Sequence, residues 1–298
     1  MKKTLPKLIV ITGPTAVGKT ALSVELAKKF NGEIVSADSR QVYKGMNLGT
    51  GKITKKEMKG IPHYLLSIAS PKRKFTVAQY KKTAEKAVEI IARKGKVPFL
   101  VGGTGFYISS LIDNIYIPEV KPDWALRKKL EKKTTKELFQ LLRKKDKQRA
   151  ENIDQNNRRR LVRAIEIVIK TKGPVPCFRK GKAHFNVLII GIKKSKKVIE
   201  KAIEKRLKKR LKKGMIAEVK RLKKQEVSWK RLEGFGLEYR FIAQHLQKKI
   251  DYEQMKERIQ KESEQYAKRQ MTWFKKDKRI HWIKNKKQAE KLIKTFMS

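Results

Sequence analysis

A short stretch near the N-terminus has the residue types and spacing of a phosphate-binding loop. The pattern G-x-x-x-x-G-K-[ST] is matched by Gly13, Pro14, Thr15, Ala16, Val17, Gly18, Lys19 and Thr20. Its glycines let backbone N–H groups turn toward a phosphate, and a following helix adds partial positive charge. Lys19 can reach the terminal phosphate, and the Thr20 hydroxyl can ligate Mg²⁺. The stretch predicts a site for a phosphate chain with Mg²⁺ but does not identify the molecule.

Polar residues also follow two further apolar stretches. Asp38 comes after residues 33–37, and there it could be a general base or a metal contact, or could close an Asx turn. Residues 97–101 run into Gly102-Gly103-Thr104-Gly105 without the carboxylate that motor and switch ATPases place after such a strand. These glycines either form a tight turn or allow a substrate to approach closely, with Thr104 as a hydrogen-bond donor.

Alternating strands and helices are expected to position these residues. Buried strands are predicted over residues 7–12, 33–37, 97–101 and 185–191, and helices over residues 20–30 and 76–94. Such alternation predicts an α/β fold with a doubly wound parallel sheet, of the type found in P-loop NTPases, and ligands at the carboxyl edge of the strands.

The later part of the chain is predicted to be mainly helical. Helices are expected over residues 122–170, with turns near 133–135 and 152–157, and over residues 195–226, 237–247, 252–276 and 284–298. We therefore expect a core domain from residues 1–118 and about 184–298. The residues between them, from about 119 to about 183, are expected to form a basic helical insertion.

The charge of the chain is strongly positive. Its 298 residues include 77 Lys+Arg and 28 Asp+Glu, a net charge of +49, which favours a polyanionic partner such as nucleic acid, although a lysine-rich composition alone is the alternative. Residues 119–298 hold 56 of the basic and 21 of the acidic side chains. The single cysteine, Cys177, excludes an intramolecular disulfide, and no apolar run approaches the roughly 18 residues that span a bilayer. We expect a cytoplasmic protein.

Several stretches together resemble the tRNA dimethylallyltransferase (tRNA isopentenyltransferase) family. Besides the phosphate loop, they are residues 36–52, 62–64, 102–107, 157–166, 214–219 and 266–274. The phosphate loop is common to many kinases, whereas residues 38–52 and 266–274 are far more specific. The resemblance covers residues 7–283.

This resemblance implies transfer of a dimethylallyl group from dimethylallyl diphosphate to the exocyclic N6 amine of the adenosine 3′ of the anticodon. The phosphate loop would hold the diphosphate leaving group, with Thr20 on Mg²⁺. Asp38 would be the general base for the attacking amine, and Thr104 would hydrogen-bond near the reacting groups. Arg206 matches an arginine that helps to hold the diphosphate, its alternative being a solvated helix charge.

The resemblance also implies contacts with the anticodon stem-loop of tRNA, whose target base must be flipped out of its stack. The residues that match such contacts are Asp38, Ser39, Arg40, Gln41, Thr104, Arg127, Arg159, Arg160, Leu161, Val162, Arg163, Gly236, Leu237, Glu238, Tyr239, Arg240, Phe241, Lys268, Arg269 and Trp273. Trp273 could stack on a base or belong to the core. The chain departs from the family pattern at Ala202, where an arginine is usual, and at Glu238, where a glycine is usual.

Three other functions are weighed against this one. A relative that prenylates free AMP or ATP is disfavoured by the basic residues 119–298, because a mononucleotide needs no extended basic surface. A small-molecule kinase could use ATP in the same loop. A non-enzymatic RNA-binding protein would not need Lys19, Thr20 and Asp38. We expect a monomer that acts without a membrane.

Overall fold

The computed structural model describes residues 5–176 and 181–298, so Cys177 lies outside the described residues. The chain divides into two compact units. Unit 1 contains Met1–Ile112 and Ala183–Ser298, and unit 2 contains Asp113–Lys182. No helix in the described ranges is both long and apolar enough to cross a membrane.

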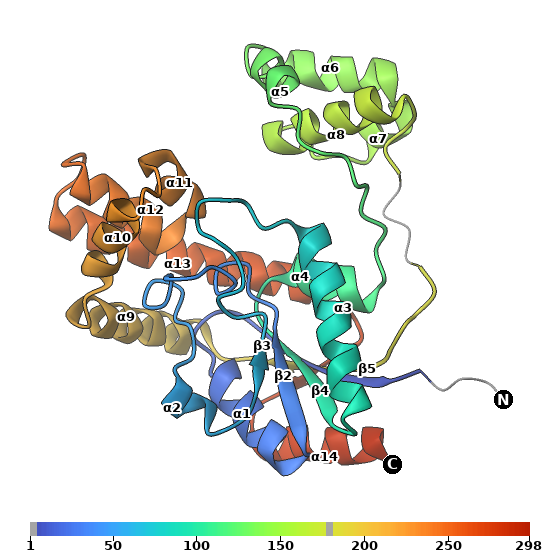
Figure 1. Cartoon of the computed structure of the whole chain (residues 1–298), viewed down its shortest axis with the longest axis vertical. Helices are drawn as coiled ribbons and strands as arrows, with labels where there is room; N and C mark the ends of the chain where they lie inside the picture. Colours follow the sequence, from blue (N-terminus) through green and yellow to red (C-terminus); the bar gives the residue numbers. More distant parts are fainter. Residues whose placement is uncertain (1–4, 177–180) are drawn as a thin grey trace. The chain divides into compact units, whose positions relative to one another are not determined.

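Unit 1 is built on a six-stranded parallel sheet, which confirms the predicted α/β fold (Figure 1). Its strand order is β3-β2-β4-β1-β5-β6, and every pair of neighbouring strands is parallel. The strands are β1 (Lys7–Thr12), β2 (Gly32–Ser36), β3 (His63–Tyr64), β4 (Val97–Val101), β5 (Asn186–Ile192) and β6 (Ile280–Ile283). Because all strands run the same way, the loops that follow β1, β2 and β4 meet at one edge of the sheet.

Successive side chains of β1 pack into the apolar clusters on opposite faces of the sheet. Leu8 and Val10 join one apolar cluster and Ile9 and Ile11 join the other, as the two-residue period of a strand requires. The first face is covered by α3 (Val77–Arg93) and α4 (Gly105–Ile112), and the second by α1 (Lys19–Lys29), α9 (Lys196–Lys212) and α14 (Lys286–Met297). A capping box of Thr76 with Gln79 starts α3 where the sequence places it.

A third apolar cluster joins four further helices of unit 1. In Figure 1, α10, α11 and α12 lie together beside α13. These helices are α10 (Met215–Lys224), α11 (Trp229–Phe235), α12 (Leu237–Leu246) and α13 (Tyr252–Phe274); the short α2 (Lys55–Met58) lies elsewhere in the unit. The cluster also buries Val42, Tyr43 and Met46 from the chain segment after β2. This packing holds that segment beside the carboxyl edge of the sheet.

The prediction of one helix over residues 195–226 is wrong. Gly214 has a φ of 90°, a left-handed conformation that suits glycine, and it separates α9 from α10. The pattern also missed the short elements α2, β3, α4, α11 and β6. Ile280–Ile283 is a four-residue strand in a lysine-rich segment, so only its pairing with β5 defines it.

Unit 2 is a small helical unit with its own apolar core. It consists of α5 (Trp124–Leu130), α6 (Thr135–Lys145), α7 (Lys147–Glu151) and α8 (Arg158–Thr171). Asp123, Thr134, Asp146 and Asn157 each accept a backbone N–H at the start of one of these helices. Leu138, Leu142, Leu161 and Ile165 fill the core between α6 and α8.

Candidate active site

The phosphate loop has the strand, loop and helix order that its sequence predicts. It connects β1 to α1, and Gly13 and Gly18 have φ values of +137° and +94°. A Cβ on Gly13 would lie 2.7 Å from the carbonyl oxygen of Ile192, so only glycine fits there. The Lys19 Nζ donates hydrogen bonds to the carbonyl oxygens of Gly13 (3.0 Å) and Pro14 (2.6 Å).

Lys19 and Arg206, two of the basic groups in this region, have lowered pKa values. Burial and the nearby positive charge of Arg206 lower the pKa of Lys19 to about 8, although Asp38 acts in the opposite direction. Burial and the charge of Arg210 lower the pKa of Arg206 to about 10. The guanidinium of Arg206 donates a 2.7 Å hydrogen bond to the Thr15 hydroxyl, so Arg206 contacts the phosphate loop and is not a solvated helix charge.

Asp38 follows β2 and forms an Asx turn. Its Oδ1 accepts the N–H groups of Arg40 (2.8 Å) and Gln41 (3.2 Å). Both hydrogen bonds use the same oxygen, and within residues 5–176 and 181–298 no hydrogen bond to Oδ2 is found. The Asx turn is therefore compatible with a chemical role, because it fixes the carboxylate without using all of it.

Thr104 lies next to Asp38 across the sheet edge. The Thr104 Oγ1 accepts the N–H of Ser39 at 3.1 Å, and the Thr104 N–H donates to the carbonyl oxygen of Ala37 at 3.1 Å. Tyr266 on α13 lies close to the Thr104 side chain. Burial, with the negative charge of Asp38, raises the pKa of Tyr266 to about 12, so its hydroxyl keeps its proton at neutral pH.

The glycines after β4 allow close approach of other parts of the protein. A Cβ on Gly102 would lie 2.1 Å from the Ala37 carbonyl oxygen. A Cβ on Gly103 would lie 2.2 Å from the Gln270 amide nitrogen, and one on Gly105 would lie 2.3 Å from the indole ring of Trp273. From sequence, the reason for these glycines was either a tight turn or a substrate, whereas their neighbours are Ala37, the residue after β2, and two side chains of α13.

Two cavities of unit 1 adjoin at these residues. The larger, of 610 Å³, contains the phosphate loop, Asp38, Lys52, Gly103 and Gln270 in its wall. The smaller, of 320 Å³, is lined by Ser39, Arg40, residues 235–240 and Arg269, among others. Their walls share Thr15, Asp38, Thr50, Arg206, Arg210 and Tyr266. A group bound in one cavity can therefore meet a group bound in the other beside Asp38.

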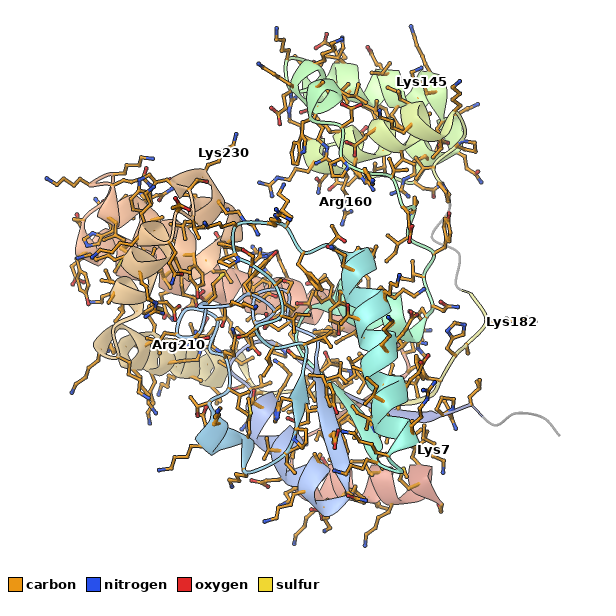
Figure 2. All side chains as sticks on the ribbon, in the orientation of Figure 1. Lys7, Lys145, Arg160, Lys182, Arg210 and Lys230 are labelled. Atoms are coloured by element: carbon orange, nitrogen blue, oxygen red, sulfur yellow. The ribbon has the colours of Figure 1, made fainter. Side chains whose placement is uncertain are left out.

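The loop of residues 47–51 forms part of both walls and is held by a buried glutamate. Glu218 on α10 accepts the N–H groups of Asn47, Leu48 and Gly49 at 2.7–3.1 Å and the Tyr239 hydroxyl at 2.7 Å. Arg210, labelled on α9 in Figure 2, pairs with Glu238 at 3.2 Å and contacts the Gly49 carbonyl oxygen. Neither Glu218 nor Arg210 was assigned a role from sequence, and their contacts with the loop of residues 47–51 span 161 to 171 residues of the chain.

The residues expected to contact tRNA have different environments in unit 1. Gly236, Leu237 and Arg240 are partly exposed at the smaller cavity, but Tyr239 and Phe241 belong to the apolar core. On α13, Lys268 and Arg269 are exposed, and Trp273 is 42% exposed with its ring in a T-shaped arrangement with that of Phe106. Trp273 is therefore a surface residue and not a core residue.

The four arginines of unit 2 that were expected to contact tRNA form two groups. Arg127 binds the buried Glu166 through two 2.7 Å hydrogen bonds, and Arg163 binds it at 2.6 Å. Arg159 and Arg160 are exposed on α8, and Figure 2 shows Arg160 projecting out of the helical unit. Leu161 is fully buried, and Val162 is partly exposed.

Two residues of α13 line the site but were given no role from sequence, Tyr266 and Gln270. They are four residues apart on one helix, so they share a face, and that spacing was a usable signal. Among the described residues, no cluster of three His, Cys, Asp or Glu side chains could hold a metal ion. Thr20 and Asp38 line the same cavity, and Mg²⁺ commonly uses few protein ligands together with phosphate oxygens. The donor set fits such an ion.

Comparisons with known proteins agree on one family. The family model described as IPP transferase matches residues 41–277. A tRNA dimethylallyltransferase of Staphylococcus epidermidis is 41% identical, with 97% of this chain and 90% of the relative covered. One from Acetivibrio thermocellus is 39% identical, with 98% and 96% covered.

Solved structures of the same kind also match. A tRNA isopentenylpyrophosphate transferase from Staphylococcus epidermidis has a TM-score of 0.71 and 38% identity, and covers 98% of each chain. A eukaryotic dimethylallyltransferase acting on tRNA has a TM-score of 0.77 and 28% identity, over 90% of this chain and 69% of the other. With the phosphate loop, Asp38 and the two adjoining cavities on one sheet edge, these matches establish that the chain belongs to the IPP transferase family.

Proposed function

We propose that this chain transfers a dimethylallyl group from dimethylallyl diphosphate to the N6 amine of the adenosine 3′ of the anticodon in tRNA. The meeting of the two cavities at Asp38 is the observation that carries the proposal. Relatives about 40% identical over nearly the whole chain are named tRNA dimethylallyltransferases, which supports the same substrate pair.

The larger cavity suits the donor. Lys19, Arg206 and the N–H groups of the phosphate loop offer positive charge to the diphosphate, and Thr20 would hold Mg²⁺ together with its oxygens. Val24, Ile53 and Leu66 give part of the same cavity an apolar lining, which suits a five-carbon group. When bound, the metal ion would neutralise charge that develops on the leaving diphosphate.

The smaller cavity suits the flipped-out adenine. In the proposed reaction the C1–O bond to diphosphate breaks, and a bond forms from the N6 nitrogen to C1. Asp38 accepts the proton that N6 loses, and Thr104, fixed by Ser39, would hydrogen-bond to the reacting groups. Lys268, Arg269 and the exposed Trp273 on α13 would contact the RNA around the cavity.

Unit 2 is proposed as the basic insertion that contacts tRNA, chiefly through the exposed Arg159 and Arg160. A free adenine nucleotide would leave such a surface without a partner, so a tRNA acceptor is favoured over AMP or ATP. We further propose a monomer that works in the cytoplasm with its tRNA substrate.

A labelling assay tests the proposed function. The protein is incubated with Mg²⁺, labelled dimethylallyl diphosphate and either tRNA, AMP or ATP. Label is expected in tRNA alone, and a transcript with guanosine 3′ of the anticodon serves as the matched control without label. Label in AMP alone, or in no RNA, would contradict the proposal.

A further inference from the structure

The side chain of Gln270 joins two loops of the candidate active site. It is 6% exposed, and both ends of its amide are used. The Gln270 Nε2 donates to the carbonyl oxygen of Gly103 at 2.7 Å, and its Oε1 accepts the N–H of Thr15 at 2.8 Å. A buried amide with a donor and an acceptor partner holds both partners in one arrangement.

The two loops belong to opposite sides of the proposed reaction. Thr15 is in the phosphate loop, where its hydroxyl also accepts the hydrogen bond from Arg206. Gly103 immediately precedes Thr104, which is hydrogen-bonded to Ser39 beside Asp38. Gln270 thus connects the loop for the leaving group to the loop for the acceptor.

The connection extends beyond the regular sheet. Pairing between β1 and β4 is continued by the Gly102 N–H to Ile11 and by the Thr12 hydroxyl to the Gly102 carbonyl oxygen, at 3.1 and 3.2 Å. Beyond these bonds the segments that follow β1 and β4 both leave the sheet. Gln270 bridges the two segments there. Because a Cβ at Gly103 would lie 2.2 Å from Nε2, the contact leaves no room for a side chain at that position.

Only an amide satisfies both partners. The Thr15 N–H needs an acceptor, and the Gly103 carbonyl needs a donor. Glutamate offers acceptors alone when ionised, and methionine has a similar shape but neither strong group. The site therefore distinguishes glutamine from its two closest substitutes.

We propose that Gln270 is a positioning residue that sets the spacing between the diphosphate loop and the acceptor side of the site. This inference rests on the proposed function. Reacting groups must lie close together and aligned, and a displacement of about 1 Å can cost about 100-fold in rate. Loss of the bridge should therefore slow the chemical step and leave the tRNA-binding surface intact.

The test compares Gln270→Met and Gln270→Glu with the wild-type protein. The single-turnover rate at saturating substrates should fall about 10- to 100-fold in both variants. The dissociation constant for tRNA should stay within about twofold. Gln247→Met is the matched control, because Gln247 also donates two hydrogen bonds, to Glu233 and to the Ala243 carbonyl oxygen, and it lines neither cavity.

Rates are expressed per folded molecule, with the folded fraction measured by circular dichroism and by tRNA binding. A merely structural role predicts a lower melting temperature with an unchanged rate per folded molecule, and that result would overturn the proposal. A variant that does not fold would count against it as well, because the bridge would then be an anchor of the fold. Failure of the proposed function is separate, since the wild-type protein would then leave tRNA unlabelled.

Discussion

At the scale of single residues, the site combines structural and chemical roles in the same side chain. Asp38 closes an Asx turn through Oδ1 and faces both cavities. Arg206 donates a hydrogen bond to Thr15 and lies near the positive charge of Arg210. Its burial and this nearby charge lower the pKa of Arg206. The folded chain holds Arg206 and the positive charges around it close together at the position proposed for the diphosphate.

Asp38→Asn should separate the two roles of Asp38. The asparagine Oδ1 can still accept the N–H groups of Arg40 and Gln41, so the turn should persist. Loss of the base should lower the single-turnover rate by a factor of about 10²–10⁴ while tRNA binding persists. Asp251→Asn is the control, because asparagine caps a helix as well as aspartate does and Asp251 caps α13. A near-normal rate for Asp38→Asn would remove Asp38 from the role of base.

Binding of diphosphate should take up protons at about pH 8.5. The pKa of Lys19 is lowered to about 8 by burial and by Arg206, so part of this lysine is neutral at that pH. A bound anion favours the charged form and raises the pKa, and Lys52, with a pKa of about 8 in the same cavity, acts with the same sign. Titration calorimetry with inorganic diphosphate in two buffers of different ionisation enthalpy measures the uptake. Equal uptake by the wild type and Lys19→Met would refute the assignment to Lys19.

At the scale of elements, α8 contains arginines with two different duties. Arg163 and, from α5, Arg127 neutralise Glu166, whose side chain is fully buried. Burial alone would raise the pKa of Glu166, but hydrogen bonds from Arg127, the Asp123 N–H and Arg163 outweigh it and lower the pKa. These two arginines stabilise unit 2, whereas Arg159 and Arg160 remain available to phosphates.

Substitutions in the two groups of arginines should therefore affect different properties, tRNA binding in one case and stability in the other. Changing Arg159 and Arg160 to alanine should leave the melting temperature unchanged and reduce the salt dependence of tRNA binding by about two units of slope. Arg127→Ala should destabilise unit 2 by about 3 kcal/mol, because Glu166 loses a bidentate partner. Thermal unfolding and filter binding at several salt concentrations measure both. The division of duties is wrong if Arg127→Ala unfolds at the wild-type temperature.

At the scale of the whole molecule, positive charge is spread over both units and far exceeds what the site needs. Few of the 77 basic side chains line either cavity, and Figure 2 shows long side chains around the surface of each unit. Such a surface attracts RNA over a distance of roughly one Debye length, about 8 Å at physiological salt. Attraction to the surface and recognition in the cavities should therefore respond differently to salt.

Raising the salt concentration from about 50 to about 200 mM should weaken tRNA binding by about 10³-fold. The KM for dimethylallyl diphosphate, measured at saturating tRNA, should change less than about threefold, because Lys19 and Arg206 are half-buried and screened less. Steady-state kinetics with sodium acetate in place of chloride is the control for specific anion effects. A parallel loss of both affinities would place the diphosphate on the exposed surface.

The sequence by itself determined the features that depend on neighbouring residues. Residues 7–20 are a buried strand, a glycine loop and a helix start in one continuous stretch, so their geometry follows from local conformation and could be predicted. The spacing of apolar residues likewise indicated β4, β5 and α3, and the stretches around Asp38 and Trp273 indicated the family.

Only the tertiary structure decided which distant side chains complete the site. Gln270 reaches Thr15 across 255 residues, and Glu218 holds a loop about 170 residues away. The family resemblance indicated Arg206, but only the structure showed its contact with Thr15, 191 residues away. Tertiary packing also separated Arg127 and Arg163 from Arg159 and Arg160, which look alike in the sequence. Hydrogen bonds of this kind depend on how helices pack on the sheet and on one another, and no local pattern records that packing.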